Sequence, residues 1–270
     1  MEARKNKTVV ITGAANGLGK ALAKEFYNLN YDLALIDVDD KGLRDLVLEL
    51  QPSNERISFH VADVSQIQEV EHVRKEIVNI HQHINILINN AGISISRPFE
   101  QTDLTDFQKL FSVNFWGTVY CTKYFLADLK TQQDSRLVNI ISDFAVMGFP
   151  GKAAYGSSKS AVMGFTNAIR TELTDSTMKI CWVMPPPLNT SLVKKGIHIN
   201  ELKRQSELEF LRRHGMPLDL AAKKIILSVE KGKFRIVTGK LMFWIDLLSR
   251  LFPELINTVI GRYKNRINFI

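Results

Sequence analysis

Short apolar runs alternate along the chain with longer segments in which apolar residues recur every three or four positions. The run Thr8–Ile11 is rich in β-branched side chains, and Asp32–Ile36 is largely aliphatic, as in buried strands. Between them, Leu22, Phe26 and Leu29 fall on one face of a helix. The pattern predicts strand, helix and strand in that order, which is the repeating unit of a parallel sheet.

The alternation continues to residue 190 and returns near the C-terminus. Strands that alternate with helices place those helices on both faces of one sheet. The prediction is an α/β fold, a doubly wound parallel sheet in a three-layer α/β/α arrangement, with residues 1–270 forming a single domain. The further strands expected are 57–61, 84–88, 137–141, 179–184 and 234–238, and the further helices are 40–50, 66–80, 103–130, 153–174 and 217–230.

Two segments fall outside the alternation. Residues 191–215 carry spaced leucines among many charges and are expected to form a helical lid over a substrate. Residues 241–270 are expected to be a helical appendage in which a broad apolar face lies beside a thin polar stripe. The stripe consists of Asp246, Arg250, Glu254 and Asn257.

The appendage allows two interpretations. One is an interfacial helix that rests on anionic lipid, followed by Arg262, Lys264 and Arg266. The other is a subunit contact or a cover for the pocket. The second is favoured, because Pro253 interrupts the helix and the polar stripe can face water.

The net charge of +7 is unevenly distributed. Residues 1–190 hold 19 Lys and Arg against 21 Asp and Glu, whereas residues 191–270 hold 16 against 7. The basic end favours an anionic surface or partner, although solvated lysines on helix faces explain it equally well. Nucleic acid is not expected as a partner, since no interleaving of aromatic and basic residues accompanies the charge.

The remaining composition is that of an ordinary cytoplasmic globule, with 45% apolar and 23% charged residues. Cys121 and Cys181 lie in apolar surroundings and are expected to be reduced core residues. The first residues lack the apolar run of a signal peptide, and no stretch is long and apolar enough to span a membrane. His81 and His83 have no third ligand at metal-site spacing, so no metal is expected.

A glycine-rich loop, Thr12 to Gly19, joins the first strand to the first helix. In that context, glycines let the backbone approach a pyrophosphate, and the helix N-terminus offers N–H groups to it. Asp37 ends the second strand, where a carboxylate suits a ribose 2′-hydroxyl and repels a 2′-phosphate. Because Asn16 is also not basic, the loop favours NAD over NADP. A plain turn aspartate at residue 37 is the alternative.

Tyr155 and Lys159 stand four residues apart in a predicted helix, so their side chains share one face. An ammonium beside a phenol favours the phenolate, and the pKa of Tyr155 is expected to fall toward neutrality. Such a phenol can exchange a proton with an alcohol or a carbonyl oxygen. Ser142 follows the strand 137–141 and is expected at the sheet edge where ligands bind.

Taken together, these residues resemble the short-chain dehydrogenase/reductase family in its Rossmann-like form. The resemblance covers about residues 7–190, and its motifs stand in the order and at the spacing typical of the family. They are Thr12-Gly13 with Gly17-Leu18-Gly19, then Asp63, Asn89-Asn90-Ala91-Gly92, Asn114, Ser142, and Tyr155 with Lys159.

The resemblance implies a role for each residue. Tyr155 would be the acid/base, Lys159 would lower its pKa and bind the nicotinamide ribose, Ser142 would hold the substrate oxygen, and Asn114 would anchor a water in a proton relay. Asn89 would tie strands together. The cofactor-binding residues implied are Gly13, Asn16, Gly17, Leu18, Gly19, Asp37, Asp63, Val64, Asn90, Tyr155, Lys159, Leu188 and Thr190.

The implied function is an NAD(P)-dependent oxidoreductase that interconverts a secondary alcohol and a ketone. Ile93, Phe144, Met147 and Phe149 are candidates for an apolar pocket, which suits a steroid, retinoid or acyl-type substrate, although plain core packing is equally open. Relatives suggest a homodimer or homotetramer. The alternatives are a non-catalytic NAD-binding protein and a membrane-surface scaffold, with peripheral membrane contact through residues 241–270.

One departure from the family pattern lies after the sixth strand, where the run Pro185-Pro186-Pro187 replaces the usual Pro-Gly. Proline fixes φ and lacks an N–H group. The loop expected to lie over the nicotinamide should therefore be stiffer than in relatives.

Overall fold

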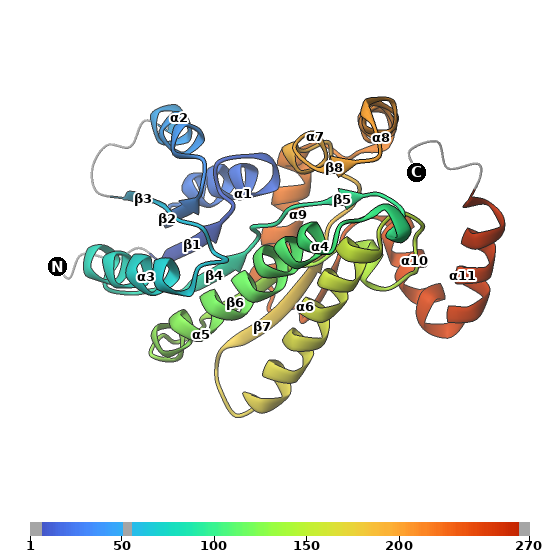
Figure 1. Ribbon diagram of the computed structural model, residues 1–270. Coiled ribbons are helices and arrows are strands. Elements are labelled where there is room, and N and C mark those ends of the chain that lie inside the picture. Colours follow the sequence, from blue (N-terminus) through green and yellow to red (C-terminus); the bar gives the residue numbers. More distant parts are fainter. Residues whose placement is uncertain (1–6, 51–55, 265–270) are drawn as a thin grey trace.

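The computed structural model describes residues 7–50 and 56–264, and their centre is a parallel sheet of seven strands (Figure 1). The strand order is β3-β2-β1-β4-β6-β7-β9, with every pairing parallel. This confirms the predicted doubly wound α/β fold. The strands are β1 Thr8–Thr12, β2 Asp32–Asp37, β3 Ile57–Val61, β4 Ile86–Asn89, β6 Arg136–Ile140, β7 Lys179–Met184 and β9 Arg235–Val237.

Successive residues of each strand enter different halves of the core, because side chains alternate across a sheet. Val9 and Ile11 join the apolar cluster beneath one layer of helices, and Val10 between them joins the cluster on the other face. The first layer is α1 Gly17–Asn28, α2 Asp40–Leu50 and α9 Leu218–Glu230. The second is α3 Ile67–His81, α5 Gly117–Lys130 and α6 Ala153–Glu172.

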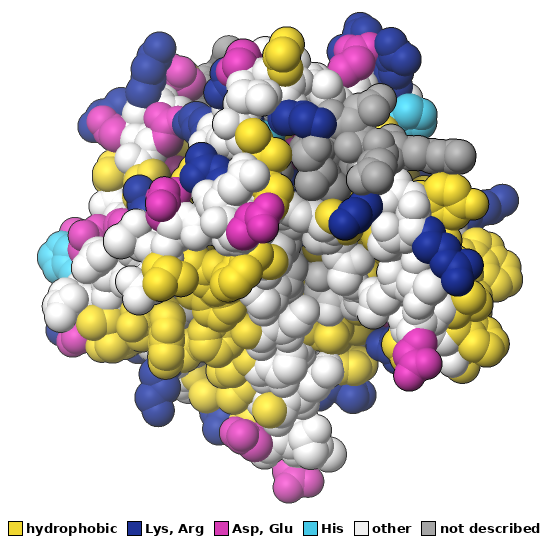
Figure 2. All heavy atoms as spheres, turned by 45° about the vertical axis from the view of Figure 1, so that its right-hand side comes forward, with side chains coloured by type: hydrophobic (Ala, Val, Ile, Leu, Met, Phe, Trp, Pro, Cys, Tyr) yellow, Lys and Arg dark blue, Asp and Glu magenta, His cyan; other side chains and the backbone are white. Residues whose placement is uncertain are grey.

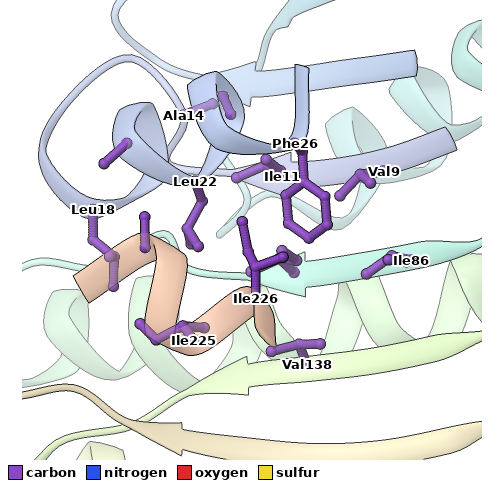
Figure 3. Close-up of a cluster of buried hydrophobic side chains, with 14 of the residues drawn as sticks. Val9, Ile11, Ala14, Leu18, Leu22, Phe26, Ile86, Val138, Ile225 and Ile226 are labelled. Atoms are coloured by element: carbon purple, nitrogen blue, oxygen red, sulfur yellow. The ribbon is translucent and has the colours of Figure 1, made fainter. Parts of the chain in front are cut away.

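Helices α1 and α9 are far apart in sequence but pack side by side on the sheet (Figure 3). Leu22 and Phe26 of α1 and Ile225 and Ile226 of α9 are at most 1% exposed. Burying a side chain of this size contributes about 1.5–3 kcal/mol. This packing explains why the late segment 218–230 belongs to the same core as the first helix.

The strand order of the sheet reverses between β1 and β4. The chain runs outward from β1 through β2 and β3, and then crosses back to pair β4 with β1 on the other side. Such a reversal opens a crevice at the carboxyl ends of the two strands, where ligands of open α/β sheets bind. The glycine loop and Asn89-Asn90 both lie at this crevice.

The helix expected over 103–130 is interrupted. It consists of α4 Leu104–Phe111, a π-helical turn Ser112–Trp116 and then α5, and Asn114 is the buried residue of the turn. π-turns are rare and frequently mark functional sites. The sequence pattern gave no sign of the wider turn.

The lid segment is more elaborate than one helix. It comprises α7 Ser191–Lys194, a short strand β8 Ile197–His198 and α8 Glu201–His214. Strand β8 pairs in parallel with β5 Ile95–Ser96, which lies in the loop after β4. Two 3₁₀ turns, η1 Phe99–Gln101 and η3 Asp143–Ala145, complete the elements around this end of the sheet.

The appendage consists of α10 Lys240–Leu251 and α11 Pro253–Arg262, which meet at Pro253. Arg266 and the rest of 265–270 lie outside the described residues. The expectation that the polar stripe faces water is wrong for Asp246, which is 1% exposed and forms an ion pair with Arg235 of β9.

The described residues also bear on the cysteines, on membrane-spanning helices and on metal-ligand groups. Cys121 and Cys181 are buried free thiols, as predicted. No described helix is long and apolar enough to cross a membrane. Within residues 7–50 and 56–264, no group of three or more His, Cys, Asp or Glu side chains is arranged to hold a metal ion.

Candidate active site

The glycine loop turns sharply between β1 and α1. Gly13 has φ +67° and Gly17 has φ +55°, both in the left-handed region that favours glycine. A Cβ on Gly19 would lie 2.0 Å from the Gly13 carbonyl oxygen, so only glycine fits there. Asn16 does not cap α1, and its side chain donates to Asp39 instead. The first-turn N–H groups of α1 are thereby left to a ligand phosphate.

Asn90 and Thr12 fix the loop to the end of β4. The Asn90 side-chain nitrogen donates to the carbonyl oxygens of Thr12 and Gly13 at 3.0 Å each, and the Thr12 hydroxyl accepts from the N–H groups of Asn90 and Ala91. These bonds hold the crevice floor in one conformation. Asn89 donates to Asn139 of β6 at 2.8 Å and thus ties two strands together, as the resemblance implied.

Asp37 ends β2 at the edge of the crevice and orders the loops around it. One carboxylate oxygen accepts from Ala15 N at 2.9 Å, and the other accepts from Asp39 N at 3.0 Å. The second bond is the one that an aspartate makes in a turn. Asp37 therefore acts as a turn residue and also lines the cavity. Lys195 of the lid forms an ion pair with Asp39 at 3.2 Å and closes this side of the crevice.

Asn114 is fully buried behind the loop that follows β4. Its side-chain oxygen accepts from Ile93 N at 2.8 Å, and its nitrogen donates to Ile93 O and to the Ser158 hydroxyl. The amide therefore fixes the loop 90–93 against α6. Asn114 makes these bonds from within the π-helical turn.

Ser142, Tyr155 and Lys159 meet at the carboxyl end of β6. Tyr155 and Lys159 lie on one face of α6, with the Lys159 Nζ 5.9 Å from the centre of the Tyr155 ring. Lys159 donates to the Ile140 carbonyl oxygen at 3.0 Å, and Ser142 lies close enough to Tyr155 to act on the pKa of its hydroxyl. All three side chains are less than 10% exposed.

The expected fall in the pKa of Tyr155 is not found. Burial raises the pKa of Tyr155, and the nearby Asp143 carboxylate raises it further, while Ser142 acts in the opposite direction. Burial also lowers the pKa of Lys159 to about 8. The spacing of the pair predicted their proximity but not the depth at which they lie, and desolvation is the largest influence on the pKa of each.

A cavity of about 670 Å³ runs through this crevice. Gly19 and Asn114 do not line it, because Gly19 lies beneath the loop and Asn114 lies behind Ile93. Of the apolar candidates, Ile93 and Phe144 line the cavity, whereas Met147 and Phe149 do not. The predicted residues on its wall are Gly13, Asn16, Gly17, Leu18, Asp37, Asp63, Val64, Asn90, Ser142, Tyr155, Lys159, Leu188 and Thr190.

Charged residues on the cavity wall that the sequence did not indicate include Asp143, Lys152 and Glu207. The Ser142 hydroxyl donates to Asp143 at 2.8 Å, and burial raises the pKa of Asp143. Lys152, just before α6, forms an ion pair at 2.7 Å with Glu207 of the lid. Lys152 and Glu207 come together only through the closed lid, so no sequence spacing signals the pair.

Two neighbours complete this buried pair. Ser96 donates to Glu207 at 2.7 Å and accepts from Lys152, and His198 Nε2 lies 3.2 Å from Glu207. Burial opposes ionisation of Glu207, but His198 and Lys152 together lower its pKa to about 2. The lid is therefore attached to the start of α6 by charge, and to the loop after β4 by the pairing of β8 with β5.

The proline run forms part of the cavity wall. Pro185, Pro186 and Pro187 all line the cavity. The Pro187 carbonyl oxygen accepts from Met216 N at 2.9 Å, which connects the run to the end of the lid. The run is thus held between β7 and the lid.

Known proteins share this arrangement. A sequence profile of the short chain dehydrogenase family matches residues 7–198. An oxidoreductase of Mycobacterium tuberculosis named SadH is 32% identical over 256 residues, covering 93% of this chain and 92% of the relative.

Solved structures agree with the sequence matches. A short-chain dehydrogenase/reductase from Burkholderia phymatum in complex with NAD superposes with a TM-score of 0.83 at 22% identity, over 94% of this chain and 96% of that one. ElxO with NADP bound superposes with a TM-score of 0.73 at 29% identity, over 86% and 96% of the two chains.

Proposed function

The chain belongs to the short-chain dehydrogenase/reductase family of NAD(P)-dependent oxidoreductases, and on that premise we propose that it interconverts a secondary alcohol and a ketone with Tyr155 as the acid/base. The observation that carries the proposal is the position of Tyr155, which lies with Ser142 and Lys159 on the wall of a cavity that also contains the glycine loop. A merely nucleotide-binding protein needs neither Ser142 nor Tyr155 there.

The residues of the crevice fit a dinucleotide. Gly13, Gly17 and Gly19 allow a diphosphate close to the backbone, Asp37 and Asp63 stand where the adenosine would lie, and Lys159 stands where the nicotinamide ribose would lie. When bound, the dinucleotide supplies or accepts the hydride. Leu188 and Thr190 then lie at the nicotinamide end of the cavity.

The chain itself handles the proton. In the reducing direction, the phenol of Tyr155, kept protonated by burial, gives its proton to the substrate carbonyl oxygen. Ser142 turns its hydroxyl from Asp143 toward the same oxygen and holds it. In the oxidising direction the alcohol loses its hydroxyl proton to the Tyr155 oxygen. Asn114 keeps the loop 90–93 in place and is the residue assigned to the proton relay.

NAD is the proposed cofactor in preference to NADP. A 2′-phosphate at the end of β2 would meet the carboxylates of Asp37 and Asp39, and Lys195, the cation nearest to them, is already paired with Asp39. Asp37→Ser should therefore lower the NAD-to-NADP ratio of kcat/KM by about tenfold or more. An unchanged ratio would assign Asp37 to the turn alone.

The proposed substrate has an apolar body, as in a steroid, retinoid or acyl-type compound. The apolar residues that line the cavity include Ile93, Phe144, Leu192 and Leu211. Residues 191–215 act as the lid that closes the cavity. The lid and the sheet belong to a single domain of residues 1–270. The proposed location is the cytoplasm. Peripheral membrane contact through residues 241–270 depends on how α10 and α11 pack.

A homodimer or homotetramer through α5 and α6 is the proposed assembly. Trp116 at the start of α5 is 47% exposed, and a Cβ on Gly164 of α6 would have nothing within 4 Å. A large exposed aromatic on one helix and an open glycine on the other both suit close contact with a second copy. Trp116→Glu should lower the mass measured by light scattering, and an unchanged mass would remove this face from the assembly.

Activity is tested with purified protein, NAD and a panel of apolar secondary alcohols. Tyr155→Phe should lower kcat/KM by about 100-fold or more, because one hydroxyl is removed from the proton transfer. Dinucleotide binding, followed by fluorescence, should persist in the variant. Turnover that survives in Tyr155→Phe would refute the assignment of the acid/base.

A further inference from the structure

Helix α10 turns a mixed apolar and polar face to the core and exposes large apolar side chains on its outer face. Its buried residues are Met242, Asp246 and Ser249, whereas Leu241 is 65% and Trp244 is 55% exposed. A surface helix normally turns its apolar stripe to the core and its charges to water. Met242 and Ile245 of α10 pack into the core, but Leu241 and Trp244 do not.

The apolar face continues along α11. None of the ten residues of α11, all of which are described, is buried. Exposed apolar residues recur at intervals of three or four within each helix, and we call these residues of the two helices together the C-terminal surface. Its members are Leu241, Trp244, Leu248, Leu251, Leu255 and Val259, each between 36% and 65% exposed.

Specific contacts hold the two helices with this face outward. Asp246 is buried in ion pairs with Arg235 of β9 and Arg250 of α10 itself. Asn257 of α11 accepts from Gly148 N at 2.9 Å, in the loop that follows Ser142. Asp246 and Asn257 thus fix one side of each helix against the body of the protein, and the apolar face is held outward.

The charges around the C-terminal surface are basic. Lys240, Arg262 and Lys264 are exposed at its two ends, and Glu254 is the exposed acid of the two helices, since Asp246 is buried. Figure 2 shows apolar side chains along the outer edge of this side of the molecule with Lys and Arg beside them. Contiguous exposed apolar area of this kind marks an interaction site.

We propose that the C-terminal surface binds an anionic lipid bilayer, with the apolar stripe in the interfacial region and Lys240, Arg262 and Lys264 against lipid headgroups. Apolar stripes flanked by Lys and Arg are typical of interfacial helices. Helices of 12 and 10 residues are too short to span a bilayer, so they lie in its surface. A two-fold contact between copies would instead bring together like charges.

The test uses the full chain and sedimentation with vesicles of phosphatidylcholine alone or mixed with phosphatidylglycerol. We expect at least about tenfold stronger binding to the mixed vesicles, and weaker binding as salt rises. The triple variant Leu241→Ser, Trp244→Ser and Leu255→Ser should lose about tenfold or more in vesicle affinity. These side chains are exposed, so folding should be unchanged by circular dichroism.

The matched control is the triple variant Leu48→Ser, Leu104→Ser and Leu202→Ser, whose side chains are 72%, 69% and 79% exposed on other faces. It should bind vesicles as the unaltered chain does. The proposal is overturned if the unaltered chain does not sediment with the mixed vesicles, or if both triple variants bind equally well. It is also overturned if the first variant changes only the mass measured by light scattering, because the surface would then join copies of the chain.

Discussion

The buried pair of Lys152 and Glu207 gives the sharpest prediction about stability. Their side chains are 3% and 7% exposed, and the two charges are 2.7 Å apart. Replacing Lys152 with Met keeps a long apolar stem but leaves the carboxylate of Glu207 buried without its ammonium partner. Removing one partner of a buried pair costs about 3–5 kcal/mol. Ser96 and His198 still contact Glu207, so we expect about 3 kcal/mol.

The pKa of Glu207 leads to a similar magnitude. Its reduction from 4.5 to about 2 corresponds to roughly 3 kcal/mol of stabilisation in the folded protein. Because the folded pKa lies below the unfolded one, this contribution is present above about pH 4.5 and is lost as the pH falls toward 2. In Lys152→Met, the free energy of unfolding should therefore fall much less between pH 4.5 and 2 than it does in the unaltered chain.

The assay is urea unfolding at several pH values, with the free energy of unfolding compared at equal m-values. The double variant Lys152→Met and Glu207→Met should be less destabilised than the sum of its single variants, because no unpaired charge remains. A loss below about 0.5 kcal/mol for Lys152→Met, with the pH dependence unchanged, would refute the view that the pair holds the lid in place.

Two further predictions concern the cofactor side of the site. Gly19→Ala places a Cβ 2.0 Å from the Gly13 carbonyl oxygen and should weaken dinucleotide binding at least about tenfold by titration, whereas Gly261→Ala, with nothing within 4 Å, should not. Since the pKa of Lys159 is about 8, the ammonium is lost as the pH rises through that value, and kcat/KM should fall above about pH 8. Lys159→Met should have a lower kcat/KM that no longer falls above about pH 8. If kcat/KM of this variant still falls near pH 8, another group is responsible for the fall.

Much of the fold could be predicted because strand signals are local. The β-branched and aliphatic runs at 8–11, 32–36, 57–61 and 179–184 lie within a residue of β1, β2, β3 and β7. The glycine loop and the spacing of Tyr155 and Lys159 are also visible in short stretches of sequence. Parallel pairing then brings their ends to one edge, so strand order and motif order together indicate the crevice.

What could not be predicted depends on contacts between distant segments. The π-turn at Asn114 serves a bond to Ile93, and β5 pairs with β8 about 100 residues later. Neither leaves a periodic pattern. Likewise, Asp246 was assigned to a water-facing stripe because a charge on a helix usually faces water, whereas its partner Arg235 belongs to another element.

The protonation state of Tyr155 shows why spacing alone was insufficient at the catalytic centre. Two residues four apart on a helix must lie near each other, but the sign of a pKa shift depends on the balance between desolvation and neighbouring charges. Here burial has the largest effect on the pKa of both Tyr155 and Lys159. The carboxylate of Asp143, adjacent to Ser142, raises the pKa of Tyr155 further. A protonated phenol is the form that reduction requires. The same burial that raises the pKa of Tyr155 therefore keeps the phenol protonated at neutral pH, in the form from which reduction of a ketone starts.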